Sequence, residues 1–180
     1  MSFEHDAQRG KIGTKQFILP VLRKIGGGEV IHTEEQASHF ERCLDFHSID
    51  GFIKSVKGLL PFAARCQFDK NYQSFAIRYS RPTEELTEYK KVTEAIKNNS
   101  MRPFYHAQAY VVDGQATVAV THTDDLFNFI KRHEDKTKIV PQDDGTELLA
   151  AFWRDLEQSS VKLKKFLVSA DGNIQQLGGC

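Results

Sequence analysis

Short stretches in which apolar and polar residues alternate predict the strands of this chain. In residues 62–68 one face carries Phe62, Ala64, Cys66 and Phe68, and the opposite face carries Ala63, Arg65 and Gln67. Residues 75–79 alternate in the same way, and the segment Asp69-Lys70-Asn71 between them has the composition of a turn. A period of two is typical of half-buried strands, so we expect these two segments to pair as a hairpin.

A second hairpin is expected from residues 105–112 and 116–120, because the Asp113-Gly114 pair between them favours a tight turn. Shorter strands are expected at residues 29–32 and 161–169. Residues 47–53 form a strand or a turn, with Asp50 at a bend before Gly51.

Apolar residues three and four positions apart predict helices that pack one face inward. The pattern covers residues 14–25, 33–45, 83–97, 123–130 and 146–156. Pro20 either kinks the first helix or delays its start, and the three glycines at 26–28 end it. Residues 133–145 are expected to be a charged loop.

The order of these elements predicts a single α/β (α+β) domain over residues 14–170, with a mixed central sheet of about five strands flanked by helices. Residues 1–13 and 171–180 are expected to be flexible. A chain of 180 residues is long enough to bury a substantial core.

Composition narrows the choice of partners. The 24 basic residues equal the 24 acidic ones, which argues against general attraction to nucleic acid but allows a local basic face. The three cysteines, Cys43, Cys66 and Cys180, are too widely spaced for a zinc ribbon or a redox pair and indicate a reducing cytoplasm. We expect Cys66 to be buried and inert. No apolar run approaches the ~18 residues of a membrane-spanning helix.

The densest set of potentially catalytic groups lies between residues 33 and 96. Arg65 and Gln67 project from one strand face, and nearby arginines repel each other unless an acid or a bound anion compensates them. We therefore expect Asp50, Arg65, Gln67 and Arg78 to gather around one pocket. His106 and Gln108 share a strand face and are further candidates for its lining. Simpler explanations exist, since Asp50 suits a turn and Lys90 suits the rim of a helix.

The order helix, strand, hairpin, helix, strand over residues 33–120 resembles the core of the PD-(D/E)XK nucleases. In that family an aspartate near the hairpin, a glutamate of the first helix and an acid-x-lysine strand form the metal site. Asp50 matches the aspartate, and the helix offers Glu34, Glu35 or Glu41. Residues 65–67 read Arg-Cys-Gln in place of acid-x-lysine. The following helix offers Lys90 for the lysine and Glu88 for the carboxylate, although a helical wheel directs Glu88 away from the apolar stripe.

This resemblance implies hydrolysis of phosphodiesters with Mg²⁺ or Mn²⁺, or other processing of DNA or RNA, in a cytoplasmic protein of bacteria or phages. The implied roles are metal binding by Asp50 and Glu35, catalysis by Asp50, Gln67 and Lys90, and substrate binding by Arg65, Arg78 and Gln108. A second hypothesis is a non-enzymatic protein on the same scaffold, which grips an anionic ligand or a protein partner. The Arg-x-Gln strand favours this second hypothesis, whereas Asp50 and the helix acids favour the first.

Overall fold

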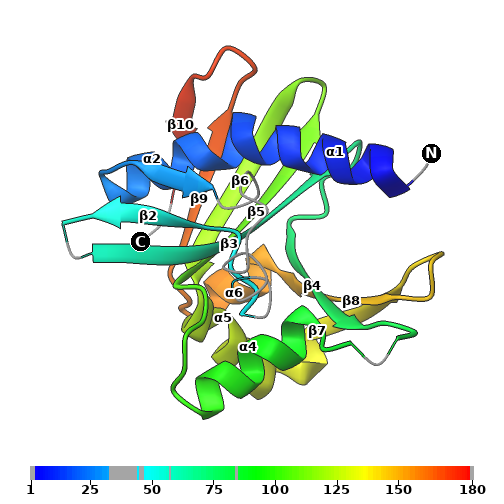
Figure 1. The fold of residues 1–180 in the computed structure, drawn as a ribbon. Coiled ribbons are helices and arrows are strands. Elements are labelled where there is room, and N and C mark those ends of the chain that lie inside the picture. The colour runs from blue at the N-terminus through cyan, green and yellow to red at the C-terminus, as the bar shows by residue number, and fades with distance from the viewer. Residues whose placement is uncertain (1–2, 33–43, 45–46, 57, 84, 179–180) are drawn as a thin grey trace.

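The computed structural model describes residues 3–32, 44, 47–56, 58–83 and 85–178. Within these residues the strands form a curled sheet of seven strands in the order β1-β2-β3-β5-β6-β9-β10 and a second sheet of three in the order β4-β8-β7 (Figure 1). The large sheet contains β1 (Val30–His32), β2 (Gly51–Ser55), β3 (Gly58–Phe68), β5 (Tyr105–Val112), β6 (Gln115–His122), β9 (Leu163–Val168) and β10 (Ile174–Gln176). The small sheet contains β4 (Ser74–Ser80), β7 (Thr137–Pro141) and β8 (Glu147–Phe152).

Helices cover both faces of the large sheet (Figure 1). One face carries α1 (Phe3–Gly13), the π-helical turn η1 (Thr14–Ile18) and α2 (Leu19–Gly26). The other face carries α4 (Glu88–Lys97), α5 (Thr123–Arg132), α6 (Trp153–Gln158) and the small sheet, with a short 3-10 turn η3 (Glu134–Lys136) before β7. The predicted α+β fold class is therefore confirmed. The main sheet has seven strands where about five were expected, and a second sheet of three strands is present.

The strand alternation of β5 explains why two cores form. Ala107, Ala109 and Val111 point into the cluster under η1 and α2, together with Phe17, Ile18 and Phe62. Tyr110 points into the opposite cluster, which contains Phe75, Leu126 and Trp153 from the small sheet and its helices. His106 and Gln108 share the Tyr110 side and are both buried. Polar side chains of the central strand thus lie where the two sheets meet.

The predicted pairing of residues 62–68 with residues 75–79 is wrong, although both segments are strands. β3 pairs with β2 and runs parallel to β5, and β4 pairs with β8 in the other sheet. Asp69 and Gln73 adopt left-handed backbone conformations, with φ of 72° and 48°, and turn the chain out of the large sheet. Asn71 fixes this turn, because its side chain accepts a hydrogen bond from the Gln73 N–H and donates one to Thr117.

Local patterns also misassigned three segments outside this region. Residues 146–156 contain β8 and α6 rather than one helix, because β8 is held between β4 and β7. The expected charged loop at 133–145 contains β7, and the expected flexible tail contains β10, which pairs with β9. The hairpin of β5 and β6 is confirmed, with positive φ at both Asp113 and Gly114. None of the described helices combines the length and the apolar character needed to span a bilayer.

The segment before residue 14, expected to be flexible, forms α1 against β3. Arg9 lies over the Phe68 ring, 4.4 Å from its centroid, and contacts Asp69 at 3.3 Å. Gly13 has no side chain, which allows the helix to approach Cys66 and Phe68 closely. Cys66 is partly buried there, and burial raises the pKa of its thiol to about 12 against the opposing charge of Arg9. A thiol with this pKa is unreactive at neutral pH, in agreement with the sequence analysis.

The two glycines that face β3 provide a test of this packing. A Cβ atom on Gly13 would lie 2.8 Å from the Phe68 ring, whereas one on Gly10 would make an ordinary contact of 3.8 Å. Gly10→Ala should raise the free energy of unfolding by up to ~1 kcal/mol, the usual gain for alanine in a helix. Gly13→Ala should lower it by about 1–3 kcal/mol through overpacking. Urea denaturation measures both, and equal stability of the two variants would contradict the packing of α1.

Candidate functional site

A pocket of about 170 Å³ opens where β3 and β5 of the large sheet meet β4 and the start of α4. Its cationic side chains are Arg65, Arg78, Arg81 and Lys91, and its carboxylates are Asp50 and Glu88. Ser48, His106 and Gln108 complete the polar lining. The four cations of this lining outnumber its two carboxylates although the chain has no net charge, while Arg81 is also paired with Glu85 outside the lining and Asp144 opposes the charge of Arg78.

Glu88 is the central acid of this pocket and the first residue of α4. The helix starts here because Thr87 is its N-cap, and the Thr87 hydroxyl donates to the Tyr79 carbonyl at 3.0 Å. Glu88 Oε2 accepts hydrogen bonds from Arg65 at 3.3 Å and from the Arg78 backbone N–H at 3.2 Å. Its Oε1 lies 3.2 Å from His106 Nε2. One carboxylate therefore joins α4 to β3, β4 and β5.

These contacts keep Glu88 ionised. Burial by itself would raise the pKa of the Glu88 carboxyl. The hydrogen bond with His106, the charges of Arg65 and of a protonated His106, and the Arg78 N–H outweigh burial and lower the pKa to about 2. Glu88 is thus a fixed negative charge, and it is unsuited to act as a general acid near neutral pH.

His106 and Gln108, neighbours on one face of β5, position other groups of the site. His106 Nδ1 lies 2.9 Å from the Thr123 hydroxyl, so both ring nitrogens of this buried side chain are engaged. Gln108 accepts a hydrogen bond from the Ala76 N–H of β4 and donates one to Gln67, both at 3.3 Å. Gln108 therefore connects the two sheets beside the pocket.

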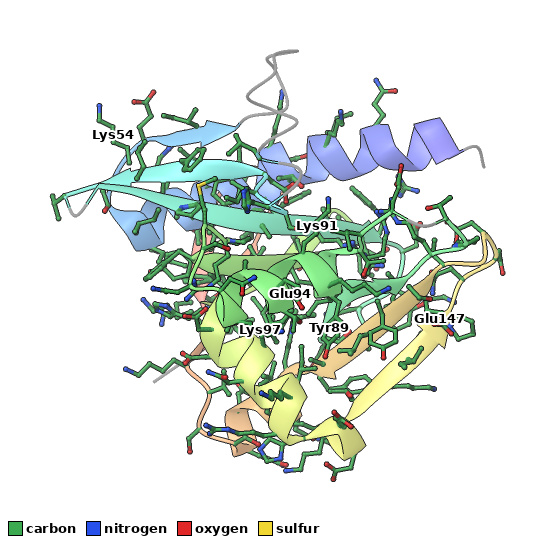
Figure 2. All side chains as sticks on the ribbon, turned by 60° about the horizontal axis from the view of Figure 1, so that its bottom comes forward. Lys54, Tyr89, Lys91, Glu94, Lys97 and Glu147 are labelled. Carbon is green, nitrogen blue, oxygen red and sulfur yellow. The ribbon has the colours of Figure 1, made fainter. Side chains whose placement is uncertain are left out.

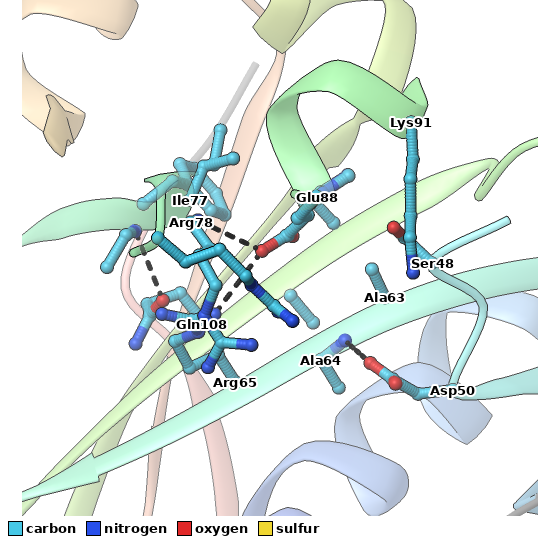
Figure 3. A pocket seen from close by; sticks show the side chains of 15 residues that line it. Ser48, Asp50, Ala63, Ala64, Arg65, Ile77, Arg78, Glu88, Lys91 and Gln108 are labelled. Atoms are coloured by element: carbon cyan, nitrogen blue, oxygen red, sulfur yellow. Dashed lines mark hydrogen bonds and ion pairs between the residues drawn. The ribbon is translucent and has the colours of Figure 1, made fainter. Parts of the chain in front are cut away.

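Arg78 carries positive charge that the described residues do not fully compensate. Its Nε atom is buried and has no hydrogen-bond partner among them. The pKa of its guanidinium is lowered by burial and by the charges of Arg65 and Arg81, with partial opposition from Glu88 and Asp144. Figure 3 shows Arg78 and Arg65 side by side, with Asp50 and Lys91 beyond Ala63 and Ala64. An anion beside Arg78 would supply both a hydrogen-bond acceptor and a compensating charge.

Asp50 lies in the same pocket, just before β2. Its Oδ2 accepts a hydrogen bond of 2.7 Å from the Ala64 N–H, and its own N–H donates to the Phe62 carbonyl at 2.9 Å. Within the described residues no group of three or more His, Cys, Asp or Glu side chains could hold a metal ion. The oxygens of Glu88 are engaged by Arg65, Arg78 and His106, so this second carboxylate does not fit a divalent cation. The described donors thus suit an anion better than a metal ion.

The pocket brings together four of the residues proposed from the sequence: Asp50, Arg65, Arg78 and Gln108. Gln67 borders a neighbouring hollow and reaches the pocket only through its bond with Gln108. Lys90 is exposed and does not line the pocket, which is a correction to the predicted arrangement. Glu35, the expected second metal ligand, lies outside the described residues, as do Glu34 and Glu41.

The start of α4 differs from the predicted start, and the residues on its inner face differ as a result. The helix was expected to begin at residue 83, whereas α4 begins at Glu88, and Leu86 before it is exposed. The inner face contains Glu88, Lys91, Val92 and Ala95, spaced as helical neighbours, and Lys91 takes the place expected for Lys90 (Figures 2 and 3). Glu88 lies four residues before Val92, so the two side chains share one face of α4.

Comparisons with protein-family models, with curated proteins and with solved structures give no match to this chain. The resemblance to PD-(D/E)XK nucleases therefore stays a prediction, and the residues of the pocket are the basis for a functional proposal.

Acid titration tests the role of Glu88. Its folded pKa of about 2 lies below the ordinary value of 4.5, so its contribution to stability is complete above pH 4.5 and is lost as the pH falls towards 2. Glu88→Gln should lower the free energy of unfolding by about 3 kcal/mol at pH 7, and this difference should shrink between pH 5 and pH 2. Glu94→Gln, an exposed change on the same helix (Figure 2), is the control. A difference that does not vary with pH would exclude an ionised, ion-paired Glu88.

Proposed function

We propose that the protein binds a phosphate-bearing ligand and that the phosphate group is held by Arg65 and Arg78. The observation that carries this proposal is the buried Arg78 Nε, which lacks an acceptor among the described residues. Guanidinium groups bind phosphate through parallel hydrogen bonds. The cations of the lining outnumber its carboxylates, which favours an anion such as a phosphate monoester, whose charge is about −1.5 to −2.

The size of the pocket supports a group rather than a whole molecule as its occupant. A volume of about 170 Å³ corresponds to about six water molecules of ~30 Å³ each. Pockets that enclose a complete small ligand are larger, at roughly 300–1,000 Å³. We therefore infer that a phosphate enters the pocket while the remainder of the ligand lies outside it.

The chemistry of the lining favours binding over proton transfer. Glu88 is ionised and engaged by three donors, and both nitrogens of His106 have partners. General acid–base catalysis needs a group that can exchange a proton with the substrate. Neither residue meets this requirement without breaking contacts that hold the two sheets together.

Phosphate titration by thermal shift tests the proposal. Inorganic phosphate should raise the Tm of the wild-type protein, because a ligand that binds only the folded state stabilises it. Arg78→Ala should weaken phosphate binding by about 1–3 kcal/mol, the contribution of a charge-assisted hydrogen bond. Arg102→Ala, which removes an arginine paired with Asp124 at 2.7 Å, should bind phosphate normally. Equal phosphate affinity of Arg78→Ala and the wild type would refute this assignment.

A second candidate function is metal-dependent phosphodiester hydrolysis, and the position of Asp50 in the cationic pocket favours it. A phosphate on Arg65 and Arg78 would lie in the same cavity as this carboxylate. Asp50 and Glu35 are the predicted ligands of Mg²⁺ or Mn²⁺, so this function depends on a residue outside the described part of the chain. A bound ion would polarise the phosphate and activate the attacking water.

Under this second candidate, Mn²⁺ should raise the Tm, and Asp50→Asn should abolish Mn²⁺-dependent nuclease activity without unfolding the protein. Asparagine retains an oxygen that can accept from the Ala64 N–H, which protects the fold. Asp113→Asn, an exposed change in the β5–β6 turn, is the matched control. Unchanged activity of Asp50→Asn in a nuclease assay would eliminate the catalytic role and leave phosphate binding as the function.

A further inference from the structure

The phosphate pocket and two further hollows share lining residues along β4 and the turn that precedes it. The second, of about 300 Å³, shares Ala76 with the pocket. The third, of about 310 Å³, shares Tyr72 and Phe152 with the second. We use the name groove for this series of three hollows. The three hollows together extend beyond a single phosphate site, because the second and third are lined by residues that do not line the phosphate pocket.

Strand geometry fixes the spacing between the first two hollows. Arg65 of β3 lines the pocket and Gln67 lines the second hollow, while on β5 the corresponding residues are Gln108 and Tyr110. Residues two apart on a strand project from the same face and are separated by roughly 7 Å. The centre of the second hollow therefore lies one such step along the same sheet face from the phosphate pocket.

The second hollow presents an aromatic ring in a fixed position. The Tyr72 side chain is 55% exposed, and its ring meets Tyr110 edge-on at 5.9 Å between centroids. Tyr110 is held in turn by hydrogen bonds of 3.0 Å to the hydroxyl and the carbonyl of Ser74. An exposed ring on an anchored loop is a platform on which a planar group can stack.

Positive charge continues along the groove beyond the phosphate pocket. Lys138 borders the second hollow, and Arg154, with a side chain that is 80% exposed and lies 3.5 Å from Asp155, borders the third. Cations thus occur before, beside and after the Tyr72 ring. A cationic groove that contains aromatic side chains is the arrangement by which proteins bind single-stranded nucleic acid, whose bases stack while its phosphates are neutralised.

We propose that the groove binds single-stranded nucleic acid. A phosphate lies on Arg65 and Arg78, an unpaired base stacks on Tyr72, and the strand continues towards Arg154. A base within a duplex has both of its faces covered by neighbouring bases and cannot stack on Tyr72. This inference rests on the proposed phosphate site and adds the class of ligand and its direction along the groove.

Binding of a fluorescent oligothymidylate, followed by anisotropy, tests the inference. Tyr72→Ala should weaken oligonucleotide binding on the order of 5- to 150-fold, the range for loss of one stacked base. Inorganic phosphate should bind this variant as it binds the wild type, because Tyr72 lies outside the phosphate pocket. Tyr72→Phe, which keeps the ring, should retain oligonucleotide binding. Arg78→Ala should lose affinity for both ligands.

The outcomes separate this inference from the proposed function. Wild-type protein that binds phosphate but not the oligonucleotide, or Tyr72→Ala that binds both normally, would overturn the groove and leave the phosphate site standing. Absence of phosphate binding would overturn the proposed function as well. Thymidine monophosphate that binds as tightly as the oligonucleotide would show that the ligand is a free nucleotide and would overturn the continued strand. Equal affinity for a duplex would overturn stacking on Tyr72.

Discussion

A single, partly buried carboxylate connects strands of both sheets of this protein to α4. Glu88 accepts hydrogen bonds from Arg65 of β3 and from the backbone of Arg78 in β4, and it pairs with His106 of β5. Removing one partner from such a buried set leaves an uncompensated charge, which is strongly destabilising. Gln108 and Tyr110 extend the connection along β5 through Ala76 and Ser74 of β4. The site is therefore part of the joint between the sheets.

The same joint creates the electrostatic imbalance that we relate to function. Glu88 accepts from Arg65, from the Arg78 backbone and from His106, while the Nε atom of Arg78 stays without an acceptor among the described residues. Three arginines and a lysine line one cavity with two carboxylates, and Arg81 is also paired with Glu85 outside it. The excess charge lies next to a groove with an exposed tyrosine, and together these features indicate an anionic ligand with a planar group.

Sequence patterns predicted the parts of the site that depend on local periodicity. The alternation in β3 correctly placed Arg65 and Gln67 opposite Phe62, and the face shared by His106 and Gln108 was also predicted. Strand partners were not predictable in this way, since β4 finds β8 about 70 residues later and the turn at Asp69 and Gln73 separates it from β3. Glu88 was named as a candidate but was directed away from the apolar stripe, because the helix was expected to begin at residue 83 and its observed start involves a tertiary contact, the bond from Thr87 to the Tyr79 carbonyl. The roles of Asp50, Gln67 and Lys90 in catalysis stay predictions.

We propose that a bound phosphate supplies the hydrogen-bond acceptor that the Nε–H of Arg78 lacks among the described residues. An NMR titration with inorganic phosphate tests this proposal directly. The signals to follow are the Nε–H resonances of the arginine side chains. The Arg78 signal should shift and exchange more slowly with solvent as phosphate is added, because its N–H gains an acceptor. The Arg102 signal should stay unchanged, because its Nε already bonds to Asp124 at 2.7 Å. An Arg78 signal that does not respond to saturating phosphate would contradict the account.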